Sequence, residues 1–416
     1  MEETGRDDPP VSRLASAVLG LFAAPRLNIR EDYQKVRRLQ RILAWVPRDP
    51  ERIRDHVVES VEGHQIPVRV FLPREAIRSG VLLFFHGGGW TLGDVDSYTA
   101  TCRTMADLTG QVVCSVDYRL APEHPYPAGL RDCLRVTQAL LDDPSLARVG
   151  GPEDVTLIGD SAGGNLVAAV TLTLREMGRA LPGAQILIYP VTQWDHDPAT
   201  SPYQSVRDYG TGLRLTSAEV QDYIAMYQPD ASRRSEPLIS PLAEDDLAGL
   251  PRTLVITAGL DLLRDEGEAF GEALRAAGTP ARVERIDGAL HGFITLPRFA
   301  RPLAAAYQHI TSFLDGDDAD SRPLERTEGT HRCASTRLPS AATGSGWTTR
   351  PTSSSPPAPT STRRSSGWPR NWTRTWTKGR CRRRSTGSMP STPCSGQCSG
   401  RASSGTTCST PVCIPR

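Results

Sequence analysis

Residues 155–163 read Val-Thr-Leu-Ile-Gly-Asp-Ser-Ala-Gly, and a helix-forming run follows them directly. The first four form an apolar run of strand length, and Ser161 stands between Gly159 and Gly163. This is the G-x-S-x-G pattern between strand and helix that a nucleophile elbow requires. Glycines are expected at these positions because side chains two residues before or after so sharp a turn would collide with neighbouring elements. The pattern predicts that Ser161 lies at the start of a helix, whose exposed amides and dipole favour developing negative charge.

Apolar runs of strand length recur on both sides of this segment. They lie at Val81–Phe85, Val112–Val116, Val155–Ile158, Ile186–Tyr189, Thr253–Thr257 and, with more alternation, Ala281–Ile286. Helix-like segments between them include Pro127–Leu141, Leu166–Met177 and Asp265–Ala277, the last followed by Gly278 as a stop signal. Nearly continuous apolar strands are typical of sheets buried on both faces by helices. The alternation predicts an α/β fold with a mostly parallel sheet.

Two segments interrupt this alternation. Residues 1–50 look helical and precede the first strand, and residues 191–235, approximately, follow a strand and include a helix near Ser217–Tyr227. An insertion at the carboxyl end of a strand lies where open α/β sheets bind ligands. We predict that both segments form a helical cap on a catalytic domain that spans residues 51–314. An ordinary surface insertion is the alternative.

Charge divides the chain into an acidic body and a basic tail. The whole chain has 48 Lys and Arg and 47 Asp and Glu, and residues 329–416 hold 14 of the basic residues and none of the acidic ones. Residues 1–328 therefore have 34 basic and 47 acidic residues, a net charge of −13. Such a body argues against nucleic acid as its partner, because phosphate binding needs a positive surface. Residues 315–328 form an acidic linker. The tail, 329–416, is expected to be disordered or an out-of-frame translation, with a nucleic-acid-binding tail as the alternative.

No metal site, disulfide framework or membrane span is predicted. Only Cys102, Cys114 and Cys133 precede the tail, too few and too scattered for a disulfide framework. The pair Cys394–Cys398 lacks further ligands at zinc-site spacing. The apolar stretch Leu14–Pro25 is shorter than the ~20 residues that span a bilayer, and acidic residues precede it, unlike in a secretion signal. We expect an amphipathic helix there and a cytoplasmic protein.

A second glycine-rich motif, His-Gly-Gly-Gly-Trp at residues 86–90, follows the strand Val81–Phe85. Acyl transfer creates an oxyanion, which needs preorganised donors in a water-poor site. Three consecutive glycines let backbone amides approach that oxygen. A phosphate-binding loop is the alternative, but the lysine of a P-loop is missing. His86 is expected to tether the loop and not to act as the base.

Ser161 needs a base, because a serine hydroxyl alone is a weak nucleophile. His291 lies in a glycine-flanked loop after the last predicted strand, and it completes the chain order serine, acid, histidine. The loop after Thr253–Thr257 offers two acids, Asp261 and Asp265. Asp261 is preferred because it is nearer the strand, whereas Asp265 opens a helix, where a carboxylate is commonly a cap.

Together these motifs resemble those of the bacterial hormone-sensitive-lipase-like esterases. The chain carries them in that family's order: HGGGW at 86–90, DYRLAPE at 117–123, GDSAGGN at 159–165 and HGF at 291–293. The resemblance covers about residues 30–314 and implies the α/β-hydrolase fold, with a mostly parallel central sheet flanked by helices and a helical cap. One departure is visible, because Leu262 stands where the family usually has a proline after the acid.

Carried over by position, the resemblance implies a catalytic triad and three oxyanion donors: Ser161, Asp261 and His291, with the amides of Gly88, Gly89 and Ala162. The expected reaction is hydrolysis of a small-molecule ester with a short to medium acyl chain through an acyl-enzyme, without cofactor or metal. Trp90 and Trp194 are expected either to line the substrate pocket or to pack in the core. An acyltransferase or amidase with the same triad and a non-catalytic ligand-binding protein are the alternatives. The sequence does not indicate an oligomeric state.

Overall fold

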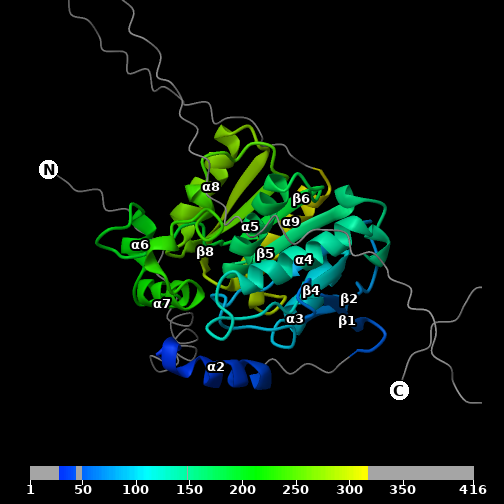
Figure 1. Ribbon diagram of the computed structural model, residues 1–416, viewed down its shortest axis with the longest axis horizontal. Helices are drawn as coiled ribbons and strands as arrows, with labels where there is room; N and C mark the ends of the chain where they lie inside the picture. The colour runs from blue at the N-terminus through cyan, green and yellow to red at the C-terminus, as the bar shows by residue number, and fades with distance from the viewer. Residues whose placement is uncertain (1–27, 44–48, 148, 317–416) are drawn as a thin grey trace, which may run out of the picture. The chain divides into compact units, whose positions relative to one another are not determined.

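The computed structural model describes residues 28–43, 49–147 and 149–316 (Figure 1). The apolar stretch near the N-terminus, nearly all of the acidic linker and the whole basic tail lie outside these residues, so the expectations for them remain predictions. Within the described ranges, no helix combines the length and the apolar character needed to cross a membrane.

An eight-stranded, mostly parallel sheet organises the described part of the chain. In spatial order its strands are β1 (Ile53–Glu59), β2 (Gln65–Phe71), β4 (Val112–Val116), β3 (Val81–Phe85), β5 (Val155–Asp160), β6 (Ala184–Ile188), β7 (Arg252–Leu260) and β8 (Ala281–Leu290). β2 pairs antiparallel with both β1 and β4, and the pairings from β4 through β3 to β8 are parallel. The predicted fold class is confirmed, and each predicted strand is present with small shifts at its ends.

Helices cover both faces of this sheet, which is why its central strands are mainly apolar. α3 (Thr99–Thr109) and α9 (Arg301–Leu314) pack on one face, and α4 (Ala128–Asp142), α5 (Ala162–Glu176) and α8 (Arg264–Ala276) pack on the other. β3, β5 and β6 are buried along their whole length. The core under α3 and α9 includes Leu82, Phe84, Met105, Ile256, Ile310 and Phe313.

The first two strands are the ones that the apolar runs miss. The predicted runs begin at Val81, whereas β1 occupies Ile53–Glu59 and β2 occupies Gln65–Phe71. β1 lies at the edge of the sheet, pairs only with β2 and keeps most of its residues exposed. Edge strands commonly carry charged side chains, which discourage pairing with another chain. β1 therefore has no apolar run to reveal it.

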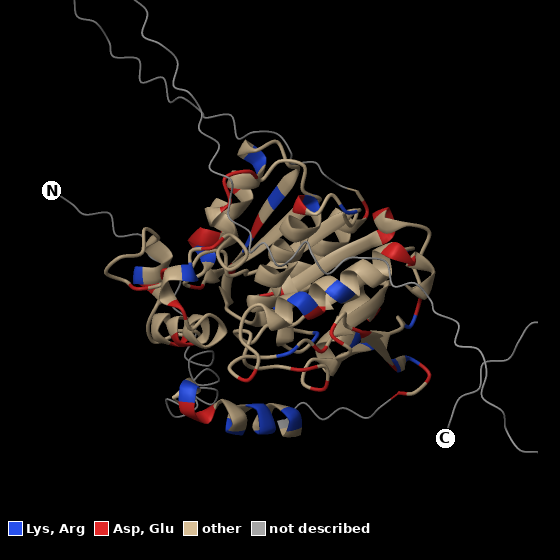
Figure 2. Ribbon diagram, in the orientation of Figure 1, with Lys and Arg blue, Asp and Glu red and all other residues tan. Residues whose placement is uncertain are grey.

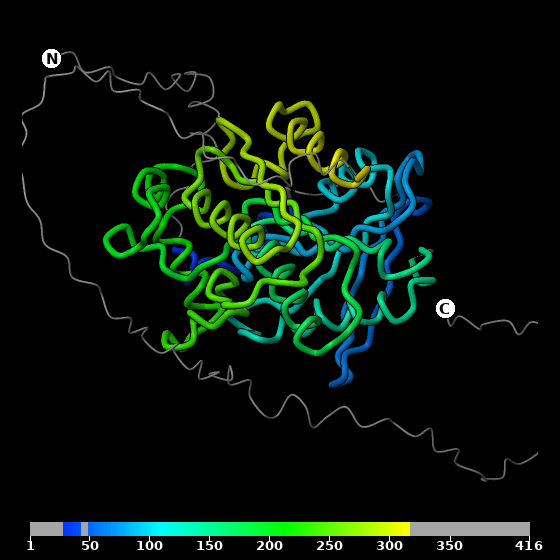
Figure 3. The backbone as a smooth tube through the Cα atoms, turned by 90° about the horizontal axis from the view of Figure 1, so that it is seen from above, coloured from blue at the N-terminus to red at the C-terminus, as the bar shows by residue number. Residues whose placement is uncertain are grey.

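Between β6 and β7 the chain leaves the sheet and forms α6 (Gln204–Tyr209) and α7 (Ser217–Tyr227), inside the segment predicted as an insertion. α7 begins with a capping box, in which Thr216 and Glu219 each accept the other's backbone N–H through a side-chain oxygen. Figure 3 shows the insertion, in green, at the end of the sheet away from β1 and β2.

The helix α2 (Ile29–Leu43) packs beside α7. Basic residues are concentrated along α2 (Figure 2), and Arg30 forms an ion pair with Asp222 of α7 at 2.5 Å. Arg37 donates to the backbone oxygens of Thr91 and Ala121 at 2.7 and 2.8 Å. A small apolar cluster lies between the two helices and the glycine-rich loop: Ile29, Leu92, Ala121 and Met226, with Tyr33, Val36 and Tyr223 packed against it. The two segments predicted to form a cap thus meet beside this loop.

Candidate active site

Ser161 occupies the sharp turn between β5 and α5. Its backbone has φ 54° and ψ −119°, a conformation that costs energy for any residue with a side chain. The Ser161 N–H donates to the carbonyl of Ile188 at 2.8 Å, which ties the turn to the end of β6. The residue is 7% exposed, so the turn is almost completely buried.

Two glycines make this turn sterically possible. A Cβ atom on Gly163 would lie 2.0 Å from the carbonyl oxygen of Phe85, at the end of β3. A Cβ atom on Gly159 would lie 2.4 Å from the carbonyl group of Gly163. Both distances are far below any normal contact, so the spacing of the glycines follows from close packing within the elbow and between the elbow and β3.

The structure brings together the three side chains predicted as a triad. His291 Nε2 lies 3.0 Å from Ser161 Oγ, and His291 Nδ1 lies 2.7 Å from Asp261 Oδ2. Asp261 is 2% exposed, and its other oxygen accepts the N–H of Leu263 at 3.1 Å. With Nδ1 donating to the carboxylate, Nε2 is left as the acceptor for the serine proton. This arrangement can turn the hydroxyl of Ser161 into a nucleophile.

Sheet register explains why the acid and the histidine meet. β7 and β8 are parallel neighbours, and Leu260 pairs with Leu290 at their carboxyl ends. Asp261 and His291 are the next residues of each strand, so they leave the sheet side by side. Asp265, the alternative acid, lies in the first turn of α8 and accepts the N–H of Ser205 at 2.8 Å.

The glycine-rich loop after β3 has the open backbone that the sequence predicts. Gly88 and Gly89 have φ angles of 108° and 60°, which favour glycine. Within the described ranges, the amides of these two residues donate to no protein acceptor. Ala162 begins α5, and the first amides of a helix have no partner inside it. All three amides are therefore available to an external anion.

His86 and Tyr118 fix the start of this loop. The His86 ring is fully buried and stacks on Tyr118 with the ring centroids 4.4 Å apart. The hydroxyl of Tyr118 donates to the carbonyl of His86 at 2.7 Å. These contacts support the expected tethering role of His86.

Asp160, next to the nucleophile, joins the loop to the elbow and was not singled out by the motif analysis. Its Oδ1 accepts the N–H of Gly87 at 2.8 Å, and its Oδ2 accepts the hydroxyls of Tyr98 and Tyr189 at 3.2 and 3.3 Å. Burial raises the pKa of Asp160, while the Gly87 amide and two nearby histidines act in the opposite direction. A carboxyl group at this position can hold the glycine-rich loop next to the nucleophile elbow.

Aromatic side chains surround the centre in a way that sequence alone does not indicate. Trp90 is 1% exposed and stacks on Tyr227 of α7 at 4.5 Å, whereas Trp194 is 44% exposed. Tyr223 of α7 lies directly over the glycine-rich loop, because a Cβ atom on Gly89 would be 2.3 Å from its ring. Trp90 is thus packed against α7 and Tyr223 lies beside Gly89, while a pocket role for Trp90 and Trp194 stays a prediction.

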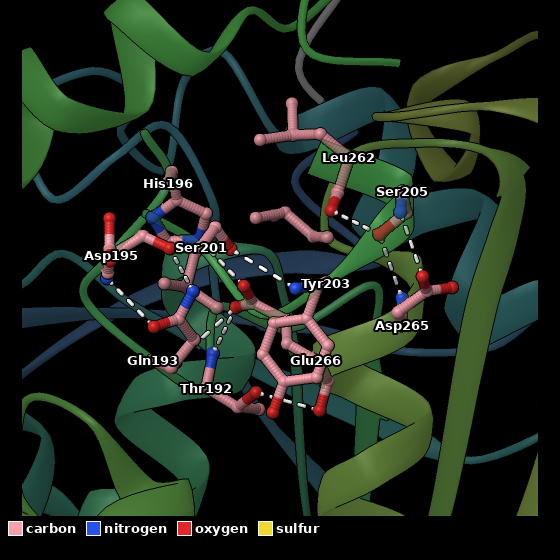
Figure 4. Close-up of polar contacts among 12 residues, drawn as sticks. Thr192, Gln193, Asp195, His196, Ser201, Tyr203, Ser205, Leu262, Asp265 and Glu266 are labelled. Atoms are coloured by element: carbon pink, nitrogen blue, oxygen red, sulfur yellow. Dashed lines mark hydrogen bonds and ion pairs between the residues drawn. The ribbon is translucent and has the colours of Figure 1, made fainter. Parts of the chain in front are cut away.

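A fully buried polar cluster fastens the insertion to α8 (Figure 4). Glu266 Oε2 lies 2.7 Å from His196 Nε2, and both side chains are 0% exposed. The other carboxylate oxygen of Glu266 accepts the N–H of Thr192 at 2.7 Å. Nearby, the Ser205 hydroxyl donates to the carbonyl of Leu262 at 2.7 Å. Leu262, the departure from the family pattern, is therefore buried and held by the insertion.

The described residues offer no group of three or more His, Cys, Asp or Glu side chains suited to a metal ion. Cys102, Cys114 and Cys133 are buried and form no disulfide. Burial raises the pKa of Cys102 and of Cys114 to about 12, so these thiols stay protonated at neutral pH and are poor nucleophiles.

Known proteins share this fold and much of this sequence. Residues 82–295 match a family model described as alpha/beta hydrolase fold. The carboxylic ester hydrolase LipN of Mycobacterium tuberculosis is 34% identical over 313 residues, 73% of this chain and 82% of LipN. The arylesterase of Saccharolobus solfataricus is 34% identical over 278 residues, 66% of this chain and 88% of the arylesterase.

A solved structure agrees with these relatives. The hyperthermophilic esterase from the archaeon Pyrobaculum calidifontis is similar with a TM-score of 0.65 and 31% identity, over 74% of this chain and 100% of that one. The topology of the sheet, the matched family model and these relatives all lead to one assignment. The chain belongs to the alpha/beta-hydrolase-fold family, among the hormone-sensitive-lipase-like esterases that its motifs resemble.

Proposed function

We propose that this protein is a serine carboxylesterase that hydrolyses small-molecule esters with short to medium acyl chains. One observation carries the proposal: the hydrogen-bonded series from Ser161 Oγ through His291 to Asp261, at 3.0 and 2.7 Å. A hydroxyl, an imidazole and a carboxylate in this order activate serine for attack on a carbonyl. The ester hydrolases and the arylesterase among the relatives support the same reaction.

In the proposed mechanism, Ser161 Oγ attacks the ester carbonyl while His291 Nε2 accepts the hydroxyl proton. Asp261 fixes the tautomer of the imidazole through Nδ1 and stabilises the imidazolium. The amides of Gly88, Gly89 and Ala162 stabilise the oxyanion of the tetrahedral intermediate: the developing charge meets donors that need no reorganisation. His291 then returns the proton to the leaving alcohol, and water hydrolyses the acyl-enzyme by the same steps.

The proposed cap consists of residues 1–50 and about 191–235, on a catalytic domain at residues 51–314. Its support is the contact between α2 and α7 beside the glycine-rich loop, and the ring of Tyr223 over Gly89. A ring at this position leaves limited room beside the acyl carbon, which favours short to medium chains. Rates across a series of 4-nitrophenyl esters of increasing acyl length test this preference, and a maximum at long chains contradicts it.

The esterase proposal is tested by Ser161→Ala with 4-nitrophenyl butyrate as substrate. We expect kcat to fall by about 10⁴-fold or more, and labelling by a fluorophosphonate probe to disappear. Ser145→Ala, at an exposed serine outside the site, is the matched control and should keep wild-type turnover and labelling. Turnover or labelling retained in the Ser161 variant contradicts the proposal, and transfer of the acyl group to an added alcohol in preference to water indicates an acyltransferase.

We also propose that the protein is cytoplasmic and that the sequence of residues 329–416 is an out-of-frame translation. The acidic residues before the apolar stretch Leu14–Pro25 support the first statement, and the complete lack of Asp and Glu in the tail supports the second. Cell fractionation tests the location. A coding sequence with one uninterrupted frame and normal codon usage through residue 416 contradicts the out-of-frame reading.

A further inference from the structure

The guanidinium of Arg214 lies against the turn that carries His291. Arg214 belongs to the loop between α6 and α7. A Cβ atom on Gly292 would lie 3.1 Å from Arg214 Cζ and 3.3 Å from both Nε and Nη2. Three nearly equal distances mean that the flat face of the guanidinium covers residue 292. Because Gly292 also has φ 77°, both its backbone and this contact favour glycine beside the base.

Arg214 carries a positive charge that no neighbour balances. Among the described residues, no carboxylate pairs with its side chain and no hydrogen bond uses its guanidinium, and the residue is exposed. The other arginines in and beside the insertion have partners: Arg207 with Gln204, Arg233 with Glu236 and Arg264 with Asp265. A guanidinium without a partner can form paired hydrogen bonds with a carboxylate from outside the chain.

The charge of Arg214 reaches the groups beneath the triad. Burial raises the pKa of Tyr189 well above its usual value of 10, and Arg214 acts in the opposite direction. The same balance holds for Tyr98, where burial and Asp160 raise the pKa and Arg214 lowers it. The ring of Tyr189 packs against His291 with the centroids 4.7 Å apart. A negative charge on a bound substrate would therefore feel Arg214 as well.

We propose that Arg214 binds a carboxylate on the alcohol portion of the ester, so that the protein prefers hydroxy acids whose hydroxyl group is acylated and whose carboxylate is free. This inference rests on the proposed esterase function. His291 returns its proton to the leaving oxygen, so the alcohol portion lies beside His291 and Gly292, while the oxyanion amides hold the acyl carbon at Ser161. The body of the protein carries a net charge of −13 over residues 1–328, which repels anions. A local cation at the exit of the leaving group offsets that repulsion.

The test compares acetyl esters that differ in one charge: 3- and 4-acetoxybenzoate against the corresponding acetoxybenzamides. Hydrolysis of each yields acetate and the hydroxy compound, so the chemistry of the acyl group is constant. The measured quantity is the ratio of kcat/KM for the carboxylate to kcat/KM for the amide. Arg179→Gln is the matched control, because Arg179 pairs with the exposed Asp142 just after the far end of α5 and its loss changes the net charge equally.

Arg214→Gln is expected to lower this ratio by about 5- to 20-fold, between the effect of an exposed ion pair and that of a hydrogen bond to a charged group. Arg214→Lys should keep part of the ratio, because the charge remains and the planar fork does not. Arg214→Glu should lower the ratio below that of the glutamine variant. Raising the salt from about 20 mM to about 500 mM should lower the wild-type ratio and leave the ratio of Arg214→Gln nearly constant.

The inference is overturned if Arg214→Gln lowers kcat/KM equally for the carboxylate and the amide, or if the ratio in Arg214→Lys is no higher than in Arg214→Gln. Arg214 is then a structural contact of the turn. The same follows if the ratio changes equally in Arg179→Gln. A response confined to an acyl-side carboxylate, seen with mono-4-nitrophenyl succinate against 4-nitrophenyl pentanoate, also overturns the assignment to the alcohol portion. Wild-type protein that hydrolyses none of these esters contradicts the esterase function itself, so the two failures are distinct.

Discussion

Replacing Asp261 with Asn changes which nitrogen of His291 carries the proton. Asp261 accepts two hydrogen bonds, from His291 Nδ1 at 2.7 Å and from the Leu263 N–H at 3.1 Å. An asparagine keeps one acceptor oxygen and gains an NH₂ group. The Leu263 amide can only donate, so it takes the oxygen and turns the NH₂ toward Nδ1. His291 must then accept at Nδ1 and carry its proton on Nε2, where it can no longer accept the proton of Ser161.

The wrong tautomer is expected to lower kcat by about 10³- to 10⁴-fold, which corresponds to about 4 to 5.5 kcal/mol of transition-state stabilisation. KM should change little, because Asp261 is buried behind the imidazole and does not contact the substrate. Steady-state rates with 4-nitrophenyl butyrate measure both constants, and circular dichroism checks that the variant is folded.

Asp265→Asn is the matched control for this experiment. Asp265 accepts the N–H of Ser205 at 2.8 Å, and the oxygen of an asparagine can keep that bond. We expect its kcat to stay within about tenfold of wild type, because the substituted group acts on the insertion and not on the imidazole. The reasoning is refuted if Asp265→Asn is the more damaging change, or if Asp261→Asn keeps more than a tenth of the wild-type kcat.

Two further predictions concern the elbow. Gly163→Ala should lower kcat by about 100-fold or more, because a Cβ atom 2.0 Å from the carbonyl oxygen of Phe85 displaces the nucleophile. Gly178→Ala, the control, has φ 63° and no atom within 4 Å, so it should cost only about 1 kcal/mol of stability. Steady-state rates and urea denaturation measure the two effects, and equal activity in both variants contradicts the prediction. Burial raises the pKa of the Asp160 carboxyl in the folded protein above 3.8, its value in the unfolded chain. The resulting contribution to the free energy of unfolding is fully present below the unfolded pKa and is lost as the pH rises through the folded pKa. Asp160→Asn should therefore be more stable than wild type toward urea at neutral pH, with an advantage that shrinks on acidification; an advantage that grows contradicts the argument.

The parallel part of the sheet could be predicted because burial on both faces leaves a nearly continuous apolar run, unbroken in β3 and interrupted only by Thr156 in the first four residues of β5. β1 could not, since its partner β2 supplies most of its contacts and its own side chains are mainly exposed. α3 is rich in threonine, and its Thr99, Thr101 and Thr109 are buried, so its apolar period is weak although the helix belongs to the core. Sequence patterns thus reveal burial by apolar residues and miss burial by polar ones.

The residues of the site also fall into two groups, those that the sequence predicts and those that only the structure reveals. Ser161, Asp261 and His291 were accessible from the sequence because each follows a predicted strand at the same edge of the sheet. Asp160, Tyr223 and Arg214 depend on neighbours that are distant in the chain: hydroxyls from other elements, a glycine under a ring, and a turn under a guanidinium. No local spacing encodes such meetings, so only the folded chain shows them.

The buried polar cluster between α8 and the insertion gives one short stretch of backbone two structural roles. Residues 262–266 begin directly after the acid of the triad, and they hold residues 192–205 through the pairs Leu262 with Ser205 and Glu266 with His196. The same stretch therefore positions Asp261 and holds the insertion. A substitution in residues 262–266 is therefore expected to disturb both the position of Asp261 and the packing of residues 192–205.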